Sequence, residues 1–485
     1  MPQLASTAPA AAPPHGTRPR ATLAVTAAAT AVALMNYTAP MLTLPDMAAA
    51  FGTPASAQAW LLNGTPLGLA VLLLVAGSLA DAHGRRRIFL LGTLALGLTT
   101  ALGGFAGSTL TFTAARIAQG AASAALLAGS LGLLAHAYPA GRDRIRATGI
   151  WGASVSGGIA LGPLLAGALS LVDWRLAYEA LGVAALVIAV VGARTLTDDR
   201  TAGGAGSDEA AAGPEKPGTR LVLAGPQKPG TRQDIAGATA LGLALAALLT
   251  ALTLGRDGWL RLPVALLLLA SVVLTALFVA VEHRSRTPMV DLALLRRPAF
   301  LASTLGALFT GLAVIGLFSV VPALLQGGAG MSPLGAAWLF VLWSGTAFVV
   351  ALQSRRLAGR LSAPYQLTLG FVLSAAGVLA LLGALEGPAD AWPRLLPGLV
   401  VAGAGSGLLN AALPRLAVDS VPPERAAMGS GANNTARYIG SSAGVALMLA
   451  LATTGTGPDT AVLVAAALAL TGAGITLTLG RRPRR

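Results

Sequence analysis

Cysteine is absent from this chain of 485 residues, and charged residues make up only 11% of it. The missing thiols exclude disulfides, thiol catalysis and cysteine-based zinc or iron–sulfur sites. The four histidines lie far apart without the spacing of metal ligands, so we expect no metal and no other cofactor. Because a soluble domain carries roughly 25% charged residues, a chain with 55% hydrophobic residues needs apolar surroundings rather than water.

Signatures of enzymes are missing as well. The sequence contains no G-x-x-x-x-G-K-[ST] phosphate-binding loop, so nucleotide hydrolysis by that route is excluded. No Ser/His/Asp arrangement stands out, and the polar segments are too short to hold a catalytic domain. We therefore predict that the protein is not an enzyme.

Long apolar runs recur along the whole chain. A helix needs about 20 apolar residues to cross the hydrocarbon core of a membrane. The sequence holds fourteen such runs, near residues 22–44, 58–80, 88–107, 110–135, 147–170, 176–193, 235–254, 262–281, 299–325, 333–353, 366–385, 395–414, 427–451 and 460–479. We therefore predict an all-α polytopic membrane protein that uses the lipid bilayer as its solvent.

The lysines and arginines are distributed unevenly between the segments that connect these runs. If the N-terminus is cytoplasmic, 27 of the 33 lie in cytoplasmic segments, four lie in segments on the other side and two lie within spans. Cytoplasmic loops of membrane proteins carry such an excess. This predicts a multi-pass protein of the cytoplasmic membrane with both termini in the cytoplasm. It also explains the net charge of +14 without any nucleic acid.

The longest polar segment contains an imperfect duplication, in which GPEKPGTR at residues 213–220 recurs as GPQKPGTR at residues 225–232. Its richness in Pro and Gly indicates a flexible linker. The predicted organisation is a cytoplasmic tail at 1–21, a six-helix bundle at 22–193, the linker at 194–234, two further helices at 235–281, a second six-helix bundle at 299–479 and a basic tail at 480–485.

The segment Gly77-Ser-Leu-Ala-Asp-Ala-His-Gly-Arg-Arg-Arg connects the second and third runs. The arginines fit any cytoplasmic loop, but the frame of Gly77, Asp81, Gly84 and Arg85 is more specific. It resembles the signature loop of the major facilitator superfamily, in which the acid is thought to latch onto the N-terminus of a helix in the other half. The resemblance implies that Asp81 faces the helix start near Ala426, where the helix dipole is positive. It also implies that these four residues take part in conformational gating.

Arg116 lies inside the fourth run, where a charged residue is costly and indicates a function. The alternative is an arginine that extends to the membrane surface, since it lies about six residues from the outer end of the run. The spacing Arg116-x-x-Gln119-Gly120 resembles the second motif of the superfamily, whose arginine is linked to proton coupling. The resemblance implies that Arg116 helps to couple transport to protons.

The fifth run carries Gly158, Gly162, Pro163 and Gly167. Small residues four apart allow another helix to pack closely, and Pro163 removes a backbone hydrogen bond and bends the helix. Generic helix packing would explain the glycines alone. The whole frame resembles the antiporter motif that marks drug exporters within the superfamily, apart from Ala166 in place of a glycine. It implies export, and a gating role for these residues.

The second half of the chain repeats features of the first. Gly359 follows the tenth run as Gly77 follows the second, and Gly440 lies on the thirteenth run as Gly158 lies on the fifth. Related halves are common in transporters, with the substrate site at their interface. We therefore expect two pseudo-symmetric halves with the site between them.

A polar stretch, Asn433-Asn-Thr-Ala-Arg437, lies within the thirteenth run. Polar groups in a span need partners or water, or they serve as packing contacts between helices. The stretch resembles one in the fourteen-helix drug:proton antiporter branch of the superfamily, as does Gln58-Ala-Trp60 at the start of the second run. This resemblance covers most of the chain. It implies a major facilitator fold of 14 transmembrane helices, with two pseudo-symmetric six-helix bundles plus two extra helices.

The first run departs from that branch. The branch usually carries an aspartate nine residues before a proline at the end of this helix, whereas here Asn36 stands nine residues before Pro45. An asparagine does not bind and release a proton near neutral pH. Glu179 is the only acid within a predicted span, and we consider it a substitute carrier that pairs with Arg116. The alternative is an interfacial glutamate whose partner is Arg175.

The sequence thus predicts proton-coupled efflux of an amphipathic small molecule, a drug or an antibiotic, by alternating access of a monomer, with the proton gradient as the energy source. The alternatives are export of a specific metabolite, an uncoupled facilitator or importer favoured by Asn36, and a transporter-like sensor that signals through the linker. The proton-coupling candidates are Arg116, Glu179 and Asn36. The residues expected near the substrate cavity are Asn36, Trp60, Asn63, Gln119, Asn410, Asn434 and Arg437.

Overall fold

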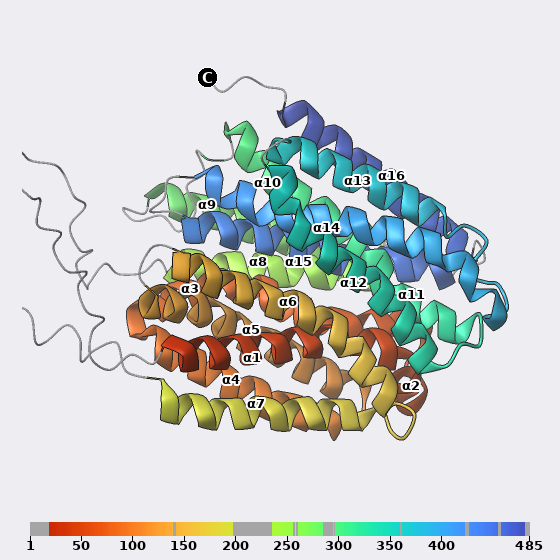
Figure 1. The fold of residues 1–485 in the computed structure, drawn as a ribbon, viewed down its shortest axis with the longest axis horizontal. Helices are drawn as coiled ribbons and strands as arrows, with labels where there is room; N and C mark the ends of the chain where they lie inside the picture. Colours follow the sequence, from red (N-terminus) through yellow and green to blue (C-terminus); the bar gives the residue numbers. More distant parts are fainter. Residues whose placement is uncertain are drawn as a thin grey trace, which may run out of the picture.

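The structure is a computed structural model whose long helices run side by side along the longest axis of the molecule (Figure 1). It describes residues 19–138, 142–196, 235–255, 258, 260–284, 294, 296–358, 361–421, 426–453 and 457–480. Every regular element within these ranges is a helix. The expected all-α class is therefore confirmed for the described part of the chain.

The described helices fall into three consecutive groups along the chain. The first group comprises α1 (Pro19–Thr38), α2 (Pro40–Phe51), the short η1 (Ala55–Ala57), α3 (Gln58–His83), α4 (Arg85–Gly104), α5 (Thr109–Ala137), α6 (Arg142–Leu169) and α7 (Arg175–Thr195). Next come α8 (Ile235–Leu254) and α9 (Leu262–Arg284). The last group comprises α10 (Pro298–Phe309), the π-helical η4 (Thr310–Ile315), α11 (Gly316–Gly327), α12 (Pro333–Ala358), α13 (Ala363–Leu379), η5 (Ala389–Leu395), α14 (Leu396–Asp419), α15 (Ala426–Thr453) and α16 (Gly457–Gly480).

Most of these helices are long and apolar enough to cross a membrane. Within the described residues there are 11 such helices, and three shorter apolar helices lie at Gln58–Leu73, Thr239–Leu254 and Ala363–Leu379. The chain is therefore a multi-pass membrane protein. The count of fourteen spans and the cytoplasmic position of both termini stay predictions.

The end of the predicted span 366–385 was wrong, because α13 already ends at Leu379. The chain turns at Gly383, whose φ of 68° is a left-handed conformation that glycine adopts readily. The backbone N–H of Gly383 also donates to Oδ1 of Asp459 at 2.8 Å. This hydrogen bond holds the turn against the start of α16, so the apolar residues after α13 do not continue the helix.

Two groups of helices pack within themselves and meet along a shared contact. In the first group α5 packs against α3 and α4, and α6 packs against α1. In the last group α14 packs against α12 and α13, and α15 packs against α10. The groups meet where α3 contacts α15, α6 contacts α12 and α2 contacts α11. This contact brings residues that lie far apart in the sequence into one region.

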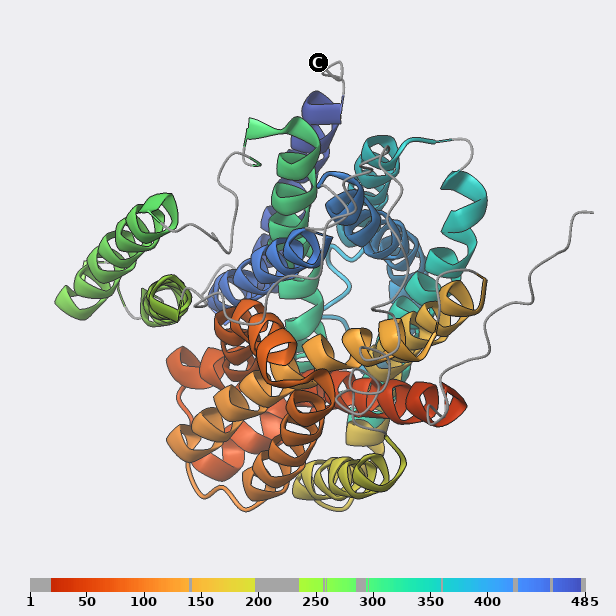
Figure 2. The same cartoon turned by 90° about the vertical axis from the view of Figure 1, so that its left-hand side faces the viewer.

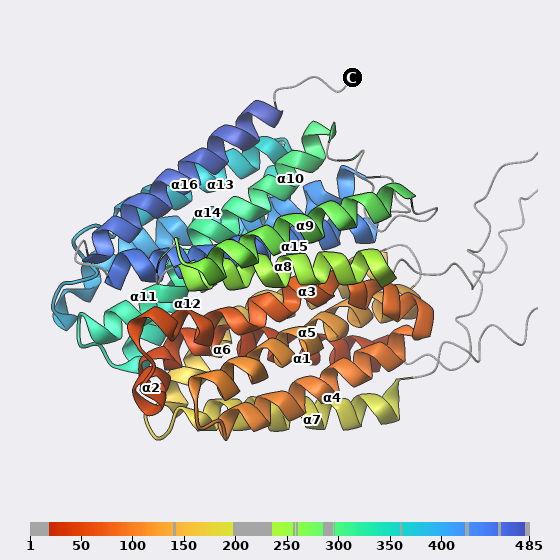
Figure 3. The same ribbon diagram turned by 180° about the vertical axis from the view of Figure 1, so that it is seen from behind.

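The helices α8 and α9 belong to neither group. They pair with each other, and α8 also packs against α3 and α15. Figure 2 shows the pair at the edge of the molecule, with α9 on the outer side of α8, and Figure 3 shows both helices from behind. The division of the chain into two bundles and an extra pair stays a prediction. The linker at 194–234, apart from residues 194–196, lies outside the described residues, as do the tail at 1–21 up to residue 18 and residues 481–485.

Candidate functional site between the helix groups

The fully buried Arg116 on α5 is the centre of a polar cluster with α1. Its side chain is 0% exposed. Nη1 donates to the backbone oxygen of Asn36 at 2.8 Å, to Oδ1 of Asn36 at 3.1 Å and to Oε1 of Gln119 at 2.7 Å. Nη2 donates to the backbone oxygen of Tyr37 at 3.4 Å. Arg116 therefore lies inside the helix packing and does not extend to the membrane surface, and its partners are neutral oxygens.

Pro40 explains why the backbone of α1 can receive this arginine. In a regular helix the carbonyl of Asn36 would accept from the N–H of residue 40, but a proline has none. Helix α1 ends at Thr38, and α2 begins at Pro40. The carbonyl oxygen of Asn36 is thus released from the helix ladder, and Arg116 supplies the missing donor.

Gln119 and Asn36 complete the cluster. Nδ2 of Asn36 donates to Oε1 of Gln119 at 3.1 Å, and Nε2 of Gln119 donates to the backbone oxygen of Thr99 on α4 at 3.0 Å. Both amides are 0% exposed. The cluster therefore ties α1, α4 and α5 together without any carboxylate. A buried arginine held by amide and carbonyl oxygens keeps its positive charge uncompensated.

A close crossing of α3 and α5 positions Arg116. The backbone of Gly120 lies so near α3 that an added Cβ would collide with the carbonyl oxygen of Thr65 and would lie 2.9 Å from the Cα of Gly68. Only a residue without a side chain allows the two helices to approach this closely. Gly120 is one turn from Arg116, so the crossing fixes the depth and direction of the guanidinium.

The structure contradicts the pairing of Glu179 with Arg116. The half-buried Glu179 on α7 faces α4, because a Cβ added at Gly104 would lie 3.2 Å from its Cγ. The alternative partner, Arg175, instead contacts Asp173, with Nη1 4.0 Å from Oδ1, and its guanidinium lies 4.6 Å from the ring centre of Trp174. The rotation of α7 about its axis, which the sequence does not specify, turns Glu179 away from Arg116.

Tyr37, which the sequence interpretation missed, links the two helix groups. Its hydroxyl lies 3.1 Å from Oγ of Ser441 on α15, and its ring makes an edge contact with Tyr438 at a centroid distance of 6.0 Å. The signal was available in the sequence, since Tyr37 follows Asn36 and Tyr438 follows Arg437. Arg116 also donates to the backbone of Tyr37, so this tyrosine connects the buried arginine with α15.

Asn63 makes a second link between the groups. Its Nδ2 donates to the backbone oxygen of Ser442 on α15 at 3.0 Å and to Oγ1 of Thr253 on α8 at 3.4 Å. The nearby Trp60 is half-buried in an apolar cluster formed by residues of α3, α5, α8 and α15. Both residues therefore lie where α3 meets α8 and α15, and Trp60 packs against apolar side chains there.

Arg437 on α15 is the arginine of the second group that lies within a predicted span. Nη1 donates to Oδ1 of Asn410 on α14 at 3.2 Å. Its Nε and Nη2 atoms are buried and have no acceptor among the described residues. Asn434 is half-buried, whereas the neighbouring Asn433 is buried and donates to Oγ of Ser303 on α10 at 2.9 Å. Asn410 and Arg437 thus form a pair, and Asn433 is a packing contact.

The glycines of α6 contact two different partners. A Cβ added at Gly158 would lie 2.5 Å from the backbone oxygen of Ala31, and one at Gly162 would collide with Thr38, both on α1. A Cβ at Gly167 would instead lie 2.9 Å from the Cβ of Ala337 on α12, in the other group. Pro163 lies between these contacts, inside α6. The motif therefore packs α6 on α1 at one end and on α12 at the other.

The same packing recurs in the second group. A Cβ at Gly440 or Gly444 on α15 would collide with the backbone oxygens of Leu308 and Leu312, on α10 and η4. Helix α1 and its counterpart α10 thus each leave regular α-helical geometry beside a pair of glycines. Helix α1 does so before Pro40, and α10 does so at the π-helical η4. π-helical segments often lie at functional sites. The loop that contains Gly359 lies outside the described residues.

The signature loop is described only in part. Gly84 has a φ of 98°, which allows the sharp change of direction between α3 and α4. Nη1 of Arg85 donates to the backbone oxygen of Gly132 on α5 at 3.3 Å, so this arginine ties α4 to α5. The predicted contact of Asp81 with the helix start at Ala426 involves side chains outside the described part of the chain. Gly77, on the same stretch of α3, is described by its backbone alone.

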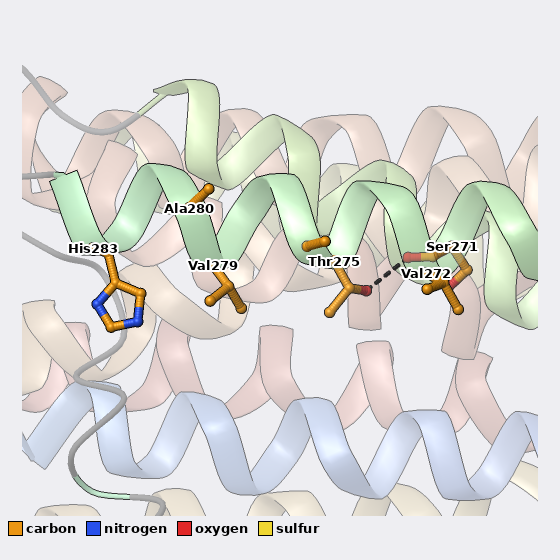
Figure 4. Close-up of a pocket in the computed structure, with 7 residues that line it drawn as sticks. Ser271, Val272, Thr275, Val279, Ala280 and His283 are labelled. Carbon is orange, nitrogen blue, oxygen red and sulfur yellow. Dashed lines mark hydrogen bonds between the residues drawn. The ribbon is translucent and has the colours of Figure 1, made fainter.

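A groove of about 630 Å³ lies on α9, away from this region, and is lined by Ser271, Val272, Thr275, Ala276, Val279, Ala280 and His283 (Figure 4). Oγ1 of Thr275 donates to the backbone oxygen of Ser271 one turn earlier, so this hydroxyl is satisfied within its own helix. All of the lining residues belong to one helix. The groove is therefore part of the outer face of α9 and not a candidate substrate site.

Comparison with known proteins agrees with this architecture. Residues 26–445 match the Major Facilitator Superfamily. The multidrug resistance protein Stp of Mycobacterium tuberculosis (strain CDC 1551 / Oshkosh) is 31% identical over 410 residues, which cover 84% of this chain and 70% of that protein. The puromycin resistance protein pur8 of Streptomyces alboniger is 31% identical over 439 residues, which cover 90% of this chain and 82% of that protein.

A solved structure shares the fold. It is a bacterial homologue of the human lysosomal transporter Spinster in an inward-facing and unoccupied conformation, with a TM-score of 0.64 and 16% identity, covering 96% of this chain and 98% of that one. The match over most of the sequence also agrees with a protein that is not an enzyme. The chain belongs to the Major Facilitator Superfamily of transporters, and it is related at about 30% identity to efflux proteins for drugs and antibiotics.

Proposed function

We propose that this chain exports amphipathic small molecules, of the drug or antibiotic kind, across the cytoplasmic membrane by alternating access. The relatives named for multidrug resistance and puromycin resistance support the direction and the kind of substrate. The observation that carries the proposal is the polar region between the helix groups. Arg116 lies in one group, Arg437 lies in the other, and Tyr37 and Ser441 connect them. A substrate bound there would contact both groups.

The contacts that would open and close are those between the groups. Nε2 of Gln326 on α11 donates to the backbone oxygen of Leu42 on α2 at 2.9 Å. Gly167 of α6 packs against Pro333 and Ala337 of α12. These contacts lie at the α2 end of the helices, which the charge distribution assigns to the outside. We therefore propose that they form an outer gate and that the structure is closed on that side.

The proposal has two versions, export with proton exchange and export without it, which differ in the energy source. Proton exchange, as the family resemblance implies, needs a group that binds and releases a proton near the site. Asn36 does not titrate, and the partners of Arg116 in the described structure are amide and carbonyl oxygens. This geometry favours the second candidate, export without proton exchange. Glu179 remains the acid through which the first candidate would act.

The export proposal is tested in a drug-sensitive bacterium that lacks its own exporters. Cells that produce the chain should accumulate less of at least one amphipathic antibiotic or dye and should grow at higher concentrations of it. The matched control is Gly162→Leu, produced at the same membrane level, because a larger side chain at this contact separates α6 from α1. Equal accumulation in cells with the chain, with the control and with neither would contradict export.

The two energy candidates are separated in liposomes with an imposed pH gradient. Export without proton exchange predicts the same initial rate of substrate movement with and without the gradient, and no change in this dependence for Glu179→Gln. If the gradient accelerates the wild type and Glu179→Gln removes the acceleration, proton exchange through Glu179 is the correct candidate.

A further inference from the structure

Near the site, the charged residues inside the predicted spans are both positive. Arg116 and Arg437 are the two cations within spans, and Glu179 is the one acid. Glu179 faces Gly104 on α4, and it is not among the described hydrogen-bond partners of either arginine. A charged group inside a membrane is costly unless it has a partner. The two arginines therefore produce a positive region between the helix groups that no carboxylate of the spans neutralises.

Arg437 has a free edge with a defined geometry. Nη1 is used by Asn410, whereas Nε and Nη2 have no acceptor among the described residues. Nε and Nη2 lie on the same edge of the guanidinium, and this edge can donate two parallel hydrogen bonds to a carboxylate or a similar oxyanion. Arg116 differs, because its side chain is 0% exposed, its Nη1 and Nη2 already donate to neighbouring oxygens, and among the described residues only its Nε lacks an acceptor. Arg437 is the arginine that a ligand can use.

The surroundings of Arg437 suit an aromatic or amphipathic body attached to the anion. Arg437 is half-buried, not fully enclosed. Ser441, one turn further along α15, contacts the hydroxyl of Tyr37, and Tyr438 packs against the ring of Tyr37. Two aromatic rings from opposite helix groups thus pack together at Tyr438, the residue next to Arg437 on α15. A ligand that bound both the charge and the rings would contact both groups.

We infer that the exported substrate is an amphipathic organic anion and that Arg437 binds its charged group. This inference rests on the proposed export function and specifies its substrate class. The inference also explains why Asn36 can stand where the antiporter branch usually carries an aspartate. The cell interior is negative, so an anion that leaves the cell moves down the membrane potential without proton exchange. A transporter of this kind needs a positive site without a protonatable carboxylate beside it, and the described partners of Arg116 and Arg437, which are amide and carbonyl oxygens, provide that combination.

The experiment uses two dyes with the same aromatic body and opposite permanent charges, pyrene with one sulfonate and pyrene with one trimethylammonium group. The purified chain is reconstituted in liposomes with valinomycin and a tenfold higher potassium concentration outside. Potassium entry makes the interior positive, so the sulfonate dye should accumulate inside up to about tenfold at equilibrium. The trimethylammonium dye should not move faster than in protein-free liposomes.

Arg437→Gln should lower the initial rate for the sulfonate dye at least tenfold and weaken its binding to the detergent-purified protein, while Arg437→Lys should retain part of both. The control is Arg415→Gln on α14. In the natural chain Nη2 of Arg415 donates to Oε1 of Gln366, so this variant should transport and bind the sulfonate dye as the wild type does. Movement of the trimethylammonium dye alone, or unchanged sulfonate binding in Arg437→Gln, overturns the inference and leaves export intact. If neither dye binds or moves and the cells also show no export, both proposals fail.

Discussion

Asn36→Asp tests whether the missing carboxylate on α1 determines the energy source. The substitution places a carboxylate oxygen where Oδ1 of Asn36 now lies, 3.1 Å from Nη1 of Arg116. Unit charges about 4 Å apart attract each other by about 4 kcal/mol at an effective dielectric constant near 20. Against this stand the loss of the hydrogen bond from Nδ2 to Gln119, about 1 kcal/mol, and a desolvation cost of several kcal/mol for the carboxylate.

These contributions nearly cancel, so we expect the free energy of unfolding to change by less than about 2 kcal/mol. The variant should therefore fold, and its carboxylate can bind and release a proton beside Arg116. One pH unit corresponds to about 1.4 kcal/mol per proton. In liposomes, the steady-state distribution of substrate in Asn36→Asp should therefore shift by up to about tenfold for each pH unit imposed, while the wild type stays insensitive.

Asn63→Asp is the matched control. It makes the same chemical change within the membrane, but Asn63 donates to the backbone oxygen of Ser442 and to Thr253, and no arginine is among its described hydrogen-bond partners. We expect it to lose thermal stability and to gain no pH dependence. The reasoning is refuted if Asn36→Asp and the wild type respond equally to the pH gradient, or if both asparagine variants respond alike.

Two further substitutions test the contacts around the site. Pro40→Ala restores a backbone N–H that competes with Arg116 for the carbonyl of Asn36; weakening this charge-assisted hydrogen bond should cost about 1.5–3 kcal/mol, seen as a lower thermal midpoint in detergent, and an unchanged midpoint would contradict the role given to Pro40. Gln326→Leu removes the hydrogen bond to Leu42, so the closed outer gate should lose about 1 kcal/mol, roughly a fivefold shift in population. The natural chain has no cysteine, so two cysteines can be introduced, one on α2 and one on α11. They should form a disulfide crosslink more slowly with Gln326→Leu than without it, and equal crosslinking rates would argue against the gate.

The positions of most helices could be predicted from the local composition of the sequence. Two boundaries could not, and each has an identifiable cause in the structure. Apolar runs mark helices because a membrane forces the backbone to satisfy its own hydrogen bonds. The span expected at 366–385 was too long because Gly383 and the distant Asp459 hold a turn there. The sequence also indicated one uninterrupted first span, whereas Pro40 divides it into α1 and α2.

The sequence identified most residues of the candidate site, but it did not identify the contacts between them. Arg116, Gln119 and Asn36 were each selected from spacing and polarity, and the structure brings them into one cluster. The pairing of Arg116 with Glu179 was wrong, because matching depth along two helices says nothing about how each helix is rotated. Tyr37 was missed because a tyrosine within an apolar run is ordinary until a partner such as Ser441 is known.

The sequence by itself determined that the chain is a multi-pass helical membrane protein of the major facilitator kind, because hydrophobic length, charge distribution and glycine motifs are properties of neighbouring residues. It also determined that Asn36 cannot carry a proton. Only the tertiary structure decided which oxygens surround Arg116, that Glu179 faces away from it, and that Arg437 keeps a free edge. These facts depend on helix rotation and crossing, which arise when segments more than 80 residues apart pack together.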